Sequence, residues 1–239
     1  MRYILVLILL LSTQFLEAQE RVYFFAEDGL KITADLYEVN PEKPYVLLFH
    51  QAGYSRGEYR EITSKVIKFG YNCLAVDLRS GGEINFIQNN TALMAVQQGF
   101  STDYLSSKRD ILAAIKWVKE RCDKPMVLFG SSFSASLCLI VAKDNSDVKA
   151  VIAFSPGEFF GAELKVQKEI ENLDVPIFAA SSSREIQYLD TILSFVPSIN
   201  KTIFAPKTGG EHGSKSLWRS NPNNQEYWLA LTMFFSKIR

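Results

Sequence analysis

The chain has 239 residues, and its 26 lysines and arginines balance its 26 aspartates and glutamates. A neutral chain gives no electrostatic reason to expect binding to nucleic acid or to an anionic membrane surface. A chain of this length can form one well-buried core but is too short for two, and no internal repeat or linker divides the sequence. We therefore expect a single domain over residues 19–239.

The first residues have the pattern of a secretory signal peptide. A basic start that includes Arg2 precedes an apolar run over residues 4–11, and polar residues then lead to Ala18. The apolar run is too short to span a membrane as a helix. We predict a signal peptide over residues 1–18, a secreted or periplasmic location, and no stable membrane insertion after cleavage. Leu16 departs from the small residue preferred at its position, so an uncleaved anchor remains an alternative.

Strand and helix patterns alternate along the rest of the chain. The predicted strands are residues 22–25, 31–37, 45–49, 72–78, 125–129, 148–154, 175–180 and 201–205, and the predicted helices are residues 58–69, 103–121, 135–142 and 225–237. The Asp28-Gly29 turn joins the first two strands as an antiparallel hairpin. The alternation that follows predicts an α/β fold with a mostly parallel central sheet and helices on both faces. In such sheets, sites lie at the carboxyl ends of the strands.

The three cysteines and the small number of histidines limit the chemistry of the chain. Cys73, Cys122 and Cys138 are an odd number, so they cannot all form disulfides. Cys73 and Cys138 lie in apolar stretches, and we interpret them as buried thiols, with a single disulfide as the alternative. The chain has only two histidines and no C-x-x-C spacing, so we expect neither a metal site nor a cofactor.

A serine lies in a sharp turn between a strand and a helix. The sequence GSSFS over residues 130–134 directly follows the apolar run that ends at Phe129, and a buried helix comes next. In this context the G-x-S-x-G pattern indicates a nucleophilic serine, because the turn lifts the central hydroxyl above the sheet. Ser132 is therefore the candidate nucleophile. Ser134 replaces the last glycine, and a serine-rich turn without chemistry is the alternative.

A serine hydroxyl needs a base, and the base needs a group that orients it. His212 lies in a glycine-rich loop after the strand-like residues 201–205, and Glu185 is the first carboxylate after the strand over residues 175–180. The chain order Ser132, Glu185, His212 is that of α/β-hydrolases and not that of chymotrypsin or subtilisin. Asp190 is a weaker candidate for the acid.

The chain resembles the α/β-hydrolase family, and most closely its compact serine esterases and dienelactone-hydrolase-like members. LLFHQAG (47–53) is similar to the family's H-G-x-G stretch after the third strand. GYNCLAVDLRSGG (70–82) is similar to its G-Y-x-V-x-x-x-D-x-R-G-x-G strand and loop, and PIFAASSSRE (176–185) takes the place of the acid-bearing segment. Three departures are Glu185 for the commoner Asp, Gln51 for the oxyanion-loop glycine and Ser182 for the glycine before the acid.

The oxyanion of an acyl transfer needs hydrogen-bond donors that are already aimed at it. We expect the backbone N–H of Phe133, at the start of a helix, and that of Ala52 or Gln51 in the loop after His50. We also place three side chains among the candidate substrate contacts, namely His50, Tyr54 and Phe159. For His50 we prefer a role in ordering its loop through hydrogen bonds over a role as a base.

These residues predict a secreted serine hydrolase that cleaves a carboxylic ester of a small molecule through a Ser132–His212–Glu185 triad and an acyl-enzyme. Within the enzyme class, a peptidase or a thioesterase is the alternative. Outside it, the relaxed motifs also fit a non-catalytic binding protein of the same fold. The sequence leaves open the acyl group, the leaving group and the oligomeric state, since one fold hosts many reactions.

Overall fold

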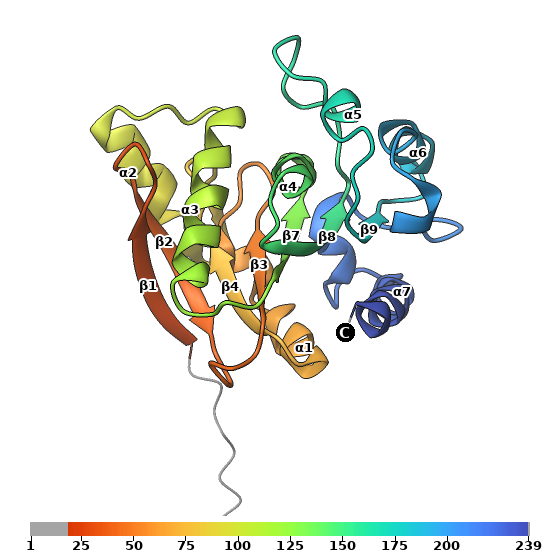
Figure 1. The fold of residues 1–239 in the computed structure, drawn as a ribbon, viewed down its shortest axis with the longest axis horizontal. Coiled ribbons are helices and arrows are strands. Elements are labelled where there is room, and N and C mark those ends of the chain that lie inside the picture. Colours follow the sequence, from red (N-terminus) through yellow and green to blue (C-terminus); the bar gives the residue numbers. More distant parts are fainter. Residues whose placement is uncertain (1–18, 239) are drawn as a thin grey trace, which may run out of the picture.

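The computed structural model describes residues 19–238, and one eight-stranded sheet runs through it (Figure 1). The strands lie in the order β1-β2-β4-β3-β7-β8-β9-β10. β2 pairs antiparallel with β1 and with β4, and the other neighbours are parallel. The sheet strands are β1 (Gln19–Phe25), β2 (Lys31–Tyr37), β3 (Tyr45–Phe49), β4 (Asn72–Val76), β7 (Met126–Ser131), β8 (Val148–Phe154), β9 (Ile177–Ala180) and β10 (Lys201–Phe204). The predicted signal peptide, residues 1–18, lies outside the described residues.

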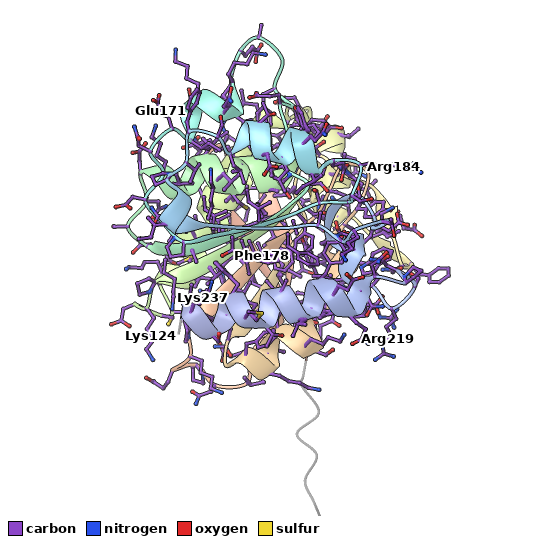
Figure 2. All side chains as sticks on the ribbon, turned by 90° about the vertical axis from the view of Figure 1, so that its right-hand side faces the viewer. Lys124, Glu171, Phe178, Arg184, Arg219 and Lys237 are labelled. Carbon is purple, nitrogen blue, oxygen red and sulfur yellow. The ribbon has the colours of Figure 1, made fainter. Side chains whose placement is uncertain are left out.

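Helices cover both faces of the sheet, as the alternating pattern predicts. The helices are α1 (Thr63–Val66), α2 (Asn90–Gln98), α3 (Lys108–Lys119), α4 (Phe133–Lys143), α5 (Val166–Glu169), α6 (Ile186–Ile192) and α7 (Asn224–Lys237). Leu47 and Phe49 of β3 belong to the core that includes α3 and α4, whereas Val46 and Leu48 belong to the core that includes α7. In Figure 2, α7 runs across the front of the molecule below Phe178. None of the helices within residues 19–238 is long and apolar enough to cross a bilayer.

The strands form where continuous apolar runs occur, because a parallel strand is buried on both faces. Every residue of β3 and of β4 is buried. The same holds for α4 from Phe133 to Ala142, so this mostly apolar helix is buried on all sides. All three cysteines are buried thiols: Cys122 and Cys138 lie in the core that includes α3 and α4, and Cys73 lies in the core that includes α7.

Three details differ from the sequence predictions. The helix predicted over residues 58–69 forms as two 3₁₀ turns, Arg56–Tyr59 and Ile67–Phe69, on either side of the single turn of α1. Its β-branched residues have low helix propensity, and the Tyr59 hydroxyl is held by the carbonyl of Phe49. Helix α2 and a small hairpin of β5 (Glu83–Ile84) and β6 (Ile87–Gln88) occupy a segment for which no element was predicted. Leu112, an apolar residue of the helix predicted over residues 103–121, is 39% exposed although the apolar spacing of that helix predicts a core contact.

A buried ion-pair cluster joins the end of β4 to α3 and to the first hairpin. Arg79 is fully buried, and its guanidinium donates to both oxygens of Asp110, with Nη2–Oδ1 at 2.7 Å. Its Nη1 donates to Asp28 Oδ2 at 2.7 Å. Asp110 is also fully buried, so its charge depends on this partner.

Replacing Arg79 by methionine should destabilise the fold by about 3–5 kcal/mol, because it leaves the Asp110 carboxylate buried without its cation. Urea unfolding at pH 7 measures the change. The control is Arg109→Met, which removes an exposed ion pair with Glu27 and should cost less than about 1 kcal/mol. If the two substitutions lowered the free energy of unfolding by the same amount, the burial of the Asp110 charge would contribute nothing to the loss.

Candidate active site

Ser132 lies at the turn between β7 and α4, where the carboxyl ends of β3, β7 and β8 point to the top of Figure 1. Its φ of 60° and ψ of −125° lie in a region that side chains rarely adopt, and such strain is concentrated at functional sites. The strand and the helix almost touch here, since a Cβ on Gly130 would lie 2.4 Å from Ala135 Cα. The turn is fixed by a hydrogen bond of 2.7 Å from Ser132 N to Phe154 O.

The structure brings the three predicted triad residues together. His212 Nε2 lies 2.8 Å from Ser132 Oγ, and His212 Nδ1 lies 2.6 Å from Glu185 Oε1. An ionised carboxylate only accepts, so Nδ1 carries the proton and Nε2 is left to accept from the serine hydroxyl. Ser132 is 5% exposed, while the His212 side chain is 42% exposed. The imidazole therefore lies between the buried serine and solvent.

The second oxygen of Glu185 is held by three donors. Glu185 Oε2 accepts from Ser155 Oγ at 2.9 Å, from Ser182 Oγ at 2.9 Å and from Ser182 N at 3.1 Å. Partial burial acts to raise the pKa of Glu185, but the bond to His212 and these serine bonds outweigh it and lower the pKa to about 2. Glu185 is therefore ionised at neutral pH. Asp190, the weaker candidate, is exposed on α6, and His212 is bonded to Glu185 instead.

Ser155 links the acid to the histidine loop, and the sequence analysis missed it. Besides donating to Glu185, its hydroxyl accepts from Gly213 N at 3.0 Å. Its φ of 50° is strained in the same sense as that of Ser132. Ser155 directly follows β8, as Ser132 follows β7. A small polar residue immediately after a buried strand is the signal that would have identified it.

Two of the three predicted oxyanion donors are free to act. The N–H groups of Phe133 and Ala52 have no hydrogen-bond partner among residues 19–238. The prediction for Gln51 is wrong, because its N–H donates to Glu58 Oε2 at 2.7 Å. A backbone donor that is already satisfied inside the protein cannot stabilise an oxyanion as well.

The His50 side chain is inaccessible to solvent, which corrects its place among the candidate substrate contacts. The ring is fully buried, its Nδ1–H donates to Gln51 O at 2.9 Å, and its Nε2 accepts from Leu78 N at 2.9 Å. Burial lowers the pKa of His50 to about 4. A neutral imidazole with both nitrogens occupied orders the loop after β3, as preferred for this residue.

Phe159 lies between two hollows near the triad. A cavity of about 150 Å³ is lined by Phe159 together with His212, Glu185, Tyr188 and Leu189, among others. A larger open groove of about 1080 Å³ is lined by Phe159 and by Tyr104, among others, and the Tyr104 ring stacks on Phe133 with the ring centroids 4.4 Å apart. Phe159 therefore lines both hollows and stays a candidate substrate contact.

Tyr54, the third candidate substrate contact, is less well placed than Phe159 to touch a substrate. Its ring is half-buried and stacks on Trp218, with ring centroids 6.3 Å apart, and it lines neither hollow.

Within residues 19–238, no group of three or more His, Cys, Asp or Glu side chains has the geometry to hold a metal ion.

Comparison with known proteins places the chain in a family. The model of the dienelactone hydrolase family matches residues 33–186, which include Ser132 and Glu185. A search of curated proteins finds no match. An esterase from Pyrococcus furiosus is similar in structure, with 17% identity, 92% of this chain and 91% of that chain covered, and a TM-score of 0.70.

Other solved structures share the same fold. A dienelactone hydrolase from Anabaena variabilis has 14% identity, covers 92% of this chain and 97% of its own, and gives a TM-score of 0.69. An acylaminoacyl peptidase from Pyrococcus horikoshii has 15% identity and a TM-score of 0.65, with 91% of this chain and 41% of that chain covered. The predicted α/β-hydrolase fold is confirmed, and the chain is a hydrolase that belongs to the dienelactone hydrolase family.

Proposed function

We propose that the protein is a serine hydrolase that cleaves the carboxylic ester of a small molecule through an acyl-enzyme on Ser132. The observation that carries the proposal is the continuous relay from Ser132 Oγ to His212 Nε2 at 2.8 Å and from His212 Nδ1 to Glu185 at 2.6 Å. The strained turn that exposes the hydroxyl to its base supports the same role.

The geometry supports a two-step reaction. Ser132 Oγ attacks the carbonyl carbon while His212 Nε2 takes its proton, and the N–H groups of Phe133 and Ala52 stabilise the oxyanion. The imidazolium then returns the proton to the leaving alcohol, which leaves Ser132 acylated. Water deacylates the serine with the same base. Glu185 keeps Nδ1 protonated throughout and stabilises the imidazolium.

The size of the cavity beside His212 supports a small substrate. This cavity of about 150 Å³ is lined by Tyr188 and Leu189, among others, and has room for a short apolar group.

The proposed location, secreted or periplasmic, rests on the signal peptide predicted over residues 1–18. Cell fractionation followed by N-terminal sequencing tests it: we expect a protein in the exported fraction that begins at residue 19, and a protein found in the cytoplasm that begins at Met1 would contradict it.

Covalent labelling with a fluorophosphonate, followed by intact mass, tests the proposed function. We expect one adduct on the native protein and none on Ser132→Ala, with labelling of His212→Ala slowed to the background rate. Turnover of a short ester such as p-nitrophenyl acetate should follow the same order. A well-folded native protein that forms no adduct would instead favour a binding protein of this fold.

A further inference from the structure

We propose that Glu58 is a positioning residue that holds three segments in fixed positions relative to one another. They are the nucleophile turn around Ser132, the histidine loop around His212 and the oxyanion loop around Ala52. The inference rests on the proposed function. Glu58 lies on the 3₁₀ turn Arg56–Tyr59 and is 0% exposed. It does not touch Ser132, His212 or Glu185 through any hydrogen bond among the described residues, so any effect it has on catalysis acts through its neighbours.

The carboxylate of Glu58 receives one hydrogen bond from each of three segments. Oε1 accepts from Ser131 Oγ at 2.7 Å and from Ser214 Oγ at 2.6 Å, and Oε2 accepts from Gln51 N at 2.7 Å. Ser131 directly precedes the nucleophile, Ser214 follows His212 by two residues, and Gln51 precedes the proposed oxyanion donor Ala52. One side chain thus joins the three parts of the chain that carry the reacting groups.

Further bonds make this junction rigid. Ser214 N donates to Ser131 Oγ at 2.9 Å, which links the nucleophile turn directly to the histidine loop. The backbone of Glu58 is itself held, because Trp218 Nε1 donates to its carbonyl at 2.9 Å. Neighbouring Tyr59 donates from its hydroxyl to Phe49 O, at the end of β3.

A carboxylate is the group that this position needs. All three partners donate, two of them hydroxyls and one a backbone N–H, and a glutamate has an acceptor for each. Burial raises the pKa of Glu58, against the lowering effect of these bonds. A buried carboxylate is costly, and an apolar side chain of similar volume would often be as good for stability alone. The site therefore fits a role in placing its three partners.

The bond to Gln51 has a direct consequence for the oxyanion site. Because Gln51 N–H is fixed on Glu58, the loop after β3 is anchored one residue before Ala52. The Ala52 N–H, which has no partner among the described residues, is then the next donor along the chain. In enzymes, a misplacement of a reacting group by about 1 Å can reduce the rate about 10²-fold.

The experiment compares Glu58→Met, Glu58→Gln and the control Asp110→Asn by kcat and KM for a short ester. Methionine fills the space and accepts none of the three bonds, so we expect kcat to fall about 10²-fold and KM to change less than about threefold. Glutamine keeps an acceptor for Gln51 N–H and should lose only about tenfold. Asp110→Asn changes another fully buried carboxylate, away from the site, and should leave kcat within about threefold.

The outcomes separate this inference from the proposed function. A folded Glu58→Met protein with native kcat would overturn the positioning role while leaving the ester hydrolase intact. A loss of kcat in Asp110→Asn as large as in Glu58→Met would show a general effect of buried charge and would also overturn it. If Glu58→Met does not fold, Glu58→Gln decides the question. A kcat for Glu58→Gln no lower than that of Asp110→Asn would also overturn the positioning role. Native protein with neither turnover nor adduct overturns both.

Discussion

Ser132→Ala and His212→Ala should each reduce kcat on the order of 10⁴- to 10⁶-fold, and the double variant should lose little more than either single one. The reason is that the two residues act as one unit: the Ser132 hydroxyl is a weak nucleophile until His212 Nε2, 2.8 Å away, accepts its proton. Steady-state kinetics on p-nitrophenyl acetate measure the effects. The rate of uncatalysed hydrolysis in buffer sets the lowest rate that can be measured.

The matched control is Ser236→Ala, which removes an exposed hydroxyl on α7 that donates to Met233 O. It should keep native kcat. If the losses in the Ser132 and His212 variants multiplied in the double variant, the two side chains would act independently, and the relay would not be the catalytic unit.

The central strands of the sheet were predictable from the sequence because they are buried on both faces. Such strands must be continuous apolar runs, and residues 45–49 and 148–154 were predicted with the bounds that β3 and β8 have. The segment over residues 58–69 was harder. Its regular spacing of apolar residues indicates a helix, but the inward side chains Glu58 and Tyr59 are fixed by partners far away in sequence, and the helix breaks into short turns.

The three proposed triad residues were found because each follows a strand and their chain order is informative. Glu58, which we propose supports them, was missed because its partners Ser131 and Ser214 are set by tertiary structure alone. Glu58 meets Ser131 and Ser214 across 73 and 156 residues of sequence, and no local pattern marks these pairs. Gln51, a reasonable oxyanion donor from its position, is not available because its N–H donates to Glu58.

Two departures from the family pattern gain a physical reason in the structure. Ser182, in place of a glycine, donates to Glu185 from both its backbone and its hydroxyl. Ser134, in place of the last glycine of the turn, donates to Phe49 O at 2.6 Å and so joins the nucleophile turn to β3. Departures that add hydrogen bonds to the site argue against the loss of its function.

Glu185→Gln should reduce kcat by about 10⁴-fold, although it changes only one atom of the side chain. The three donors around Oε2, from Ser155 and Ser182, require a carbonyl oxygen at that place. The amide NH₂ must then face His212 Nδ1, which becomes an acceptor. The proton moves to Nε2, where it points at Ser132 and leaves the hydroxyl without a base.

Steady-state kinetics on the same ester, with fluorophosphonate labelling as a second measure of the Ser132 hydroxyl, test this prediction. The control is Asp190→Asn, the same chemical change at the exposed carboxylate of α6, which should keep native kcat. A large loss in the Asp190 variant with little loss in the Glu185 variant would move the acid to Asp190. If neither variant lost activity, His212 would be oriented without a carboxylate, and the tautomer argument would fail.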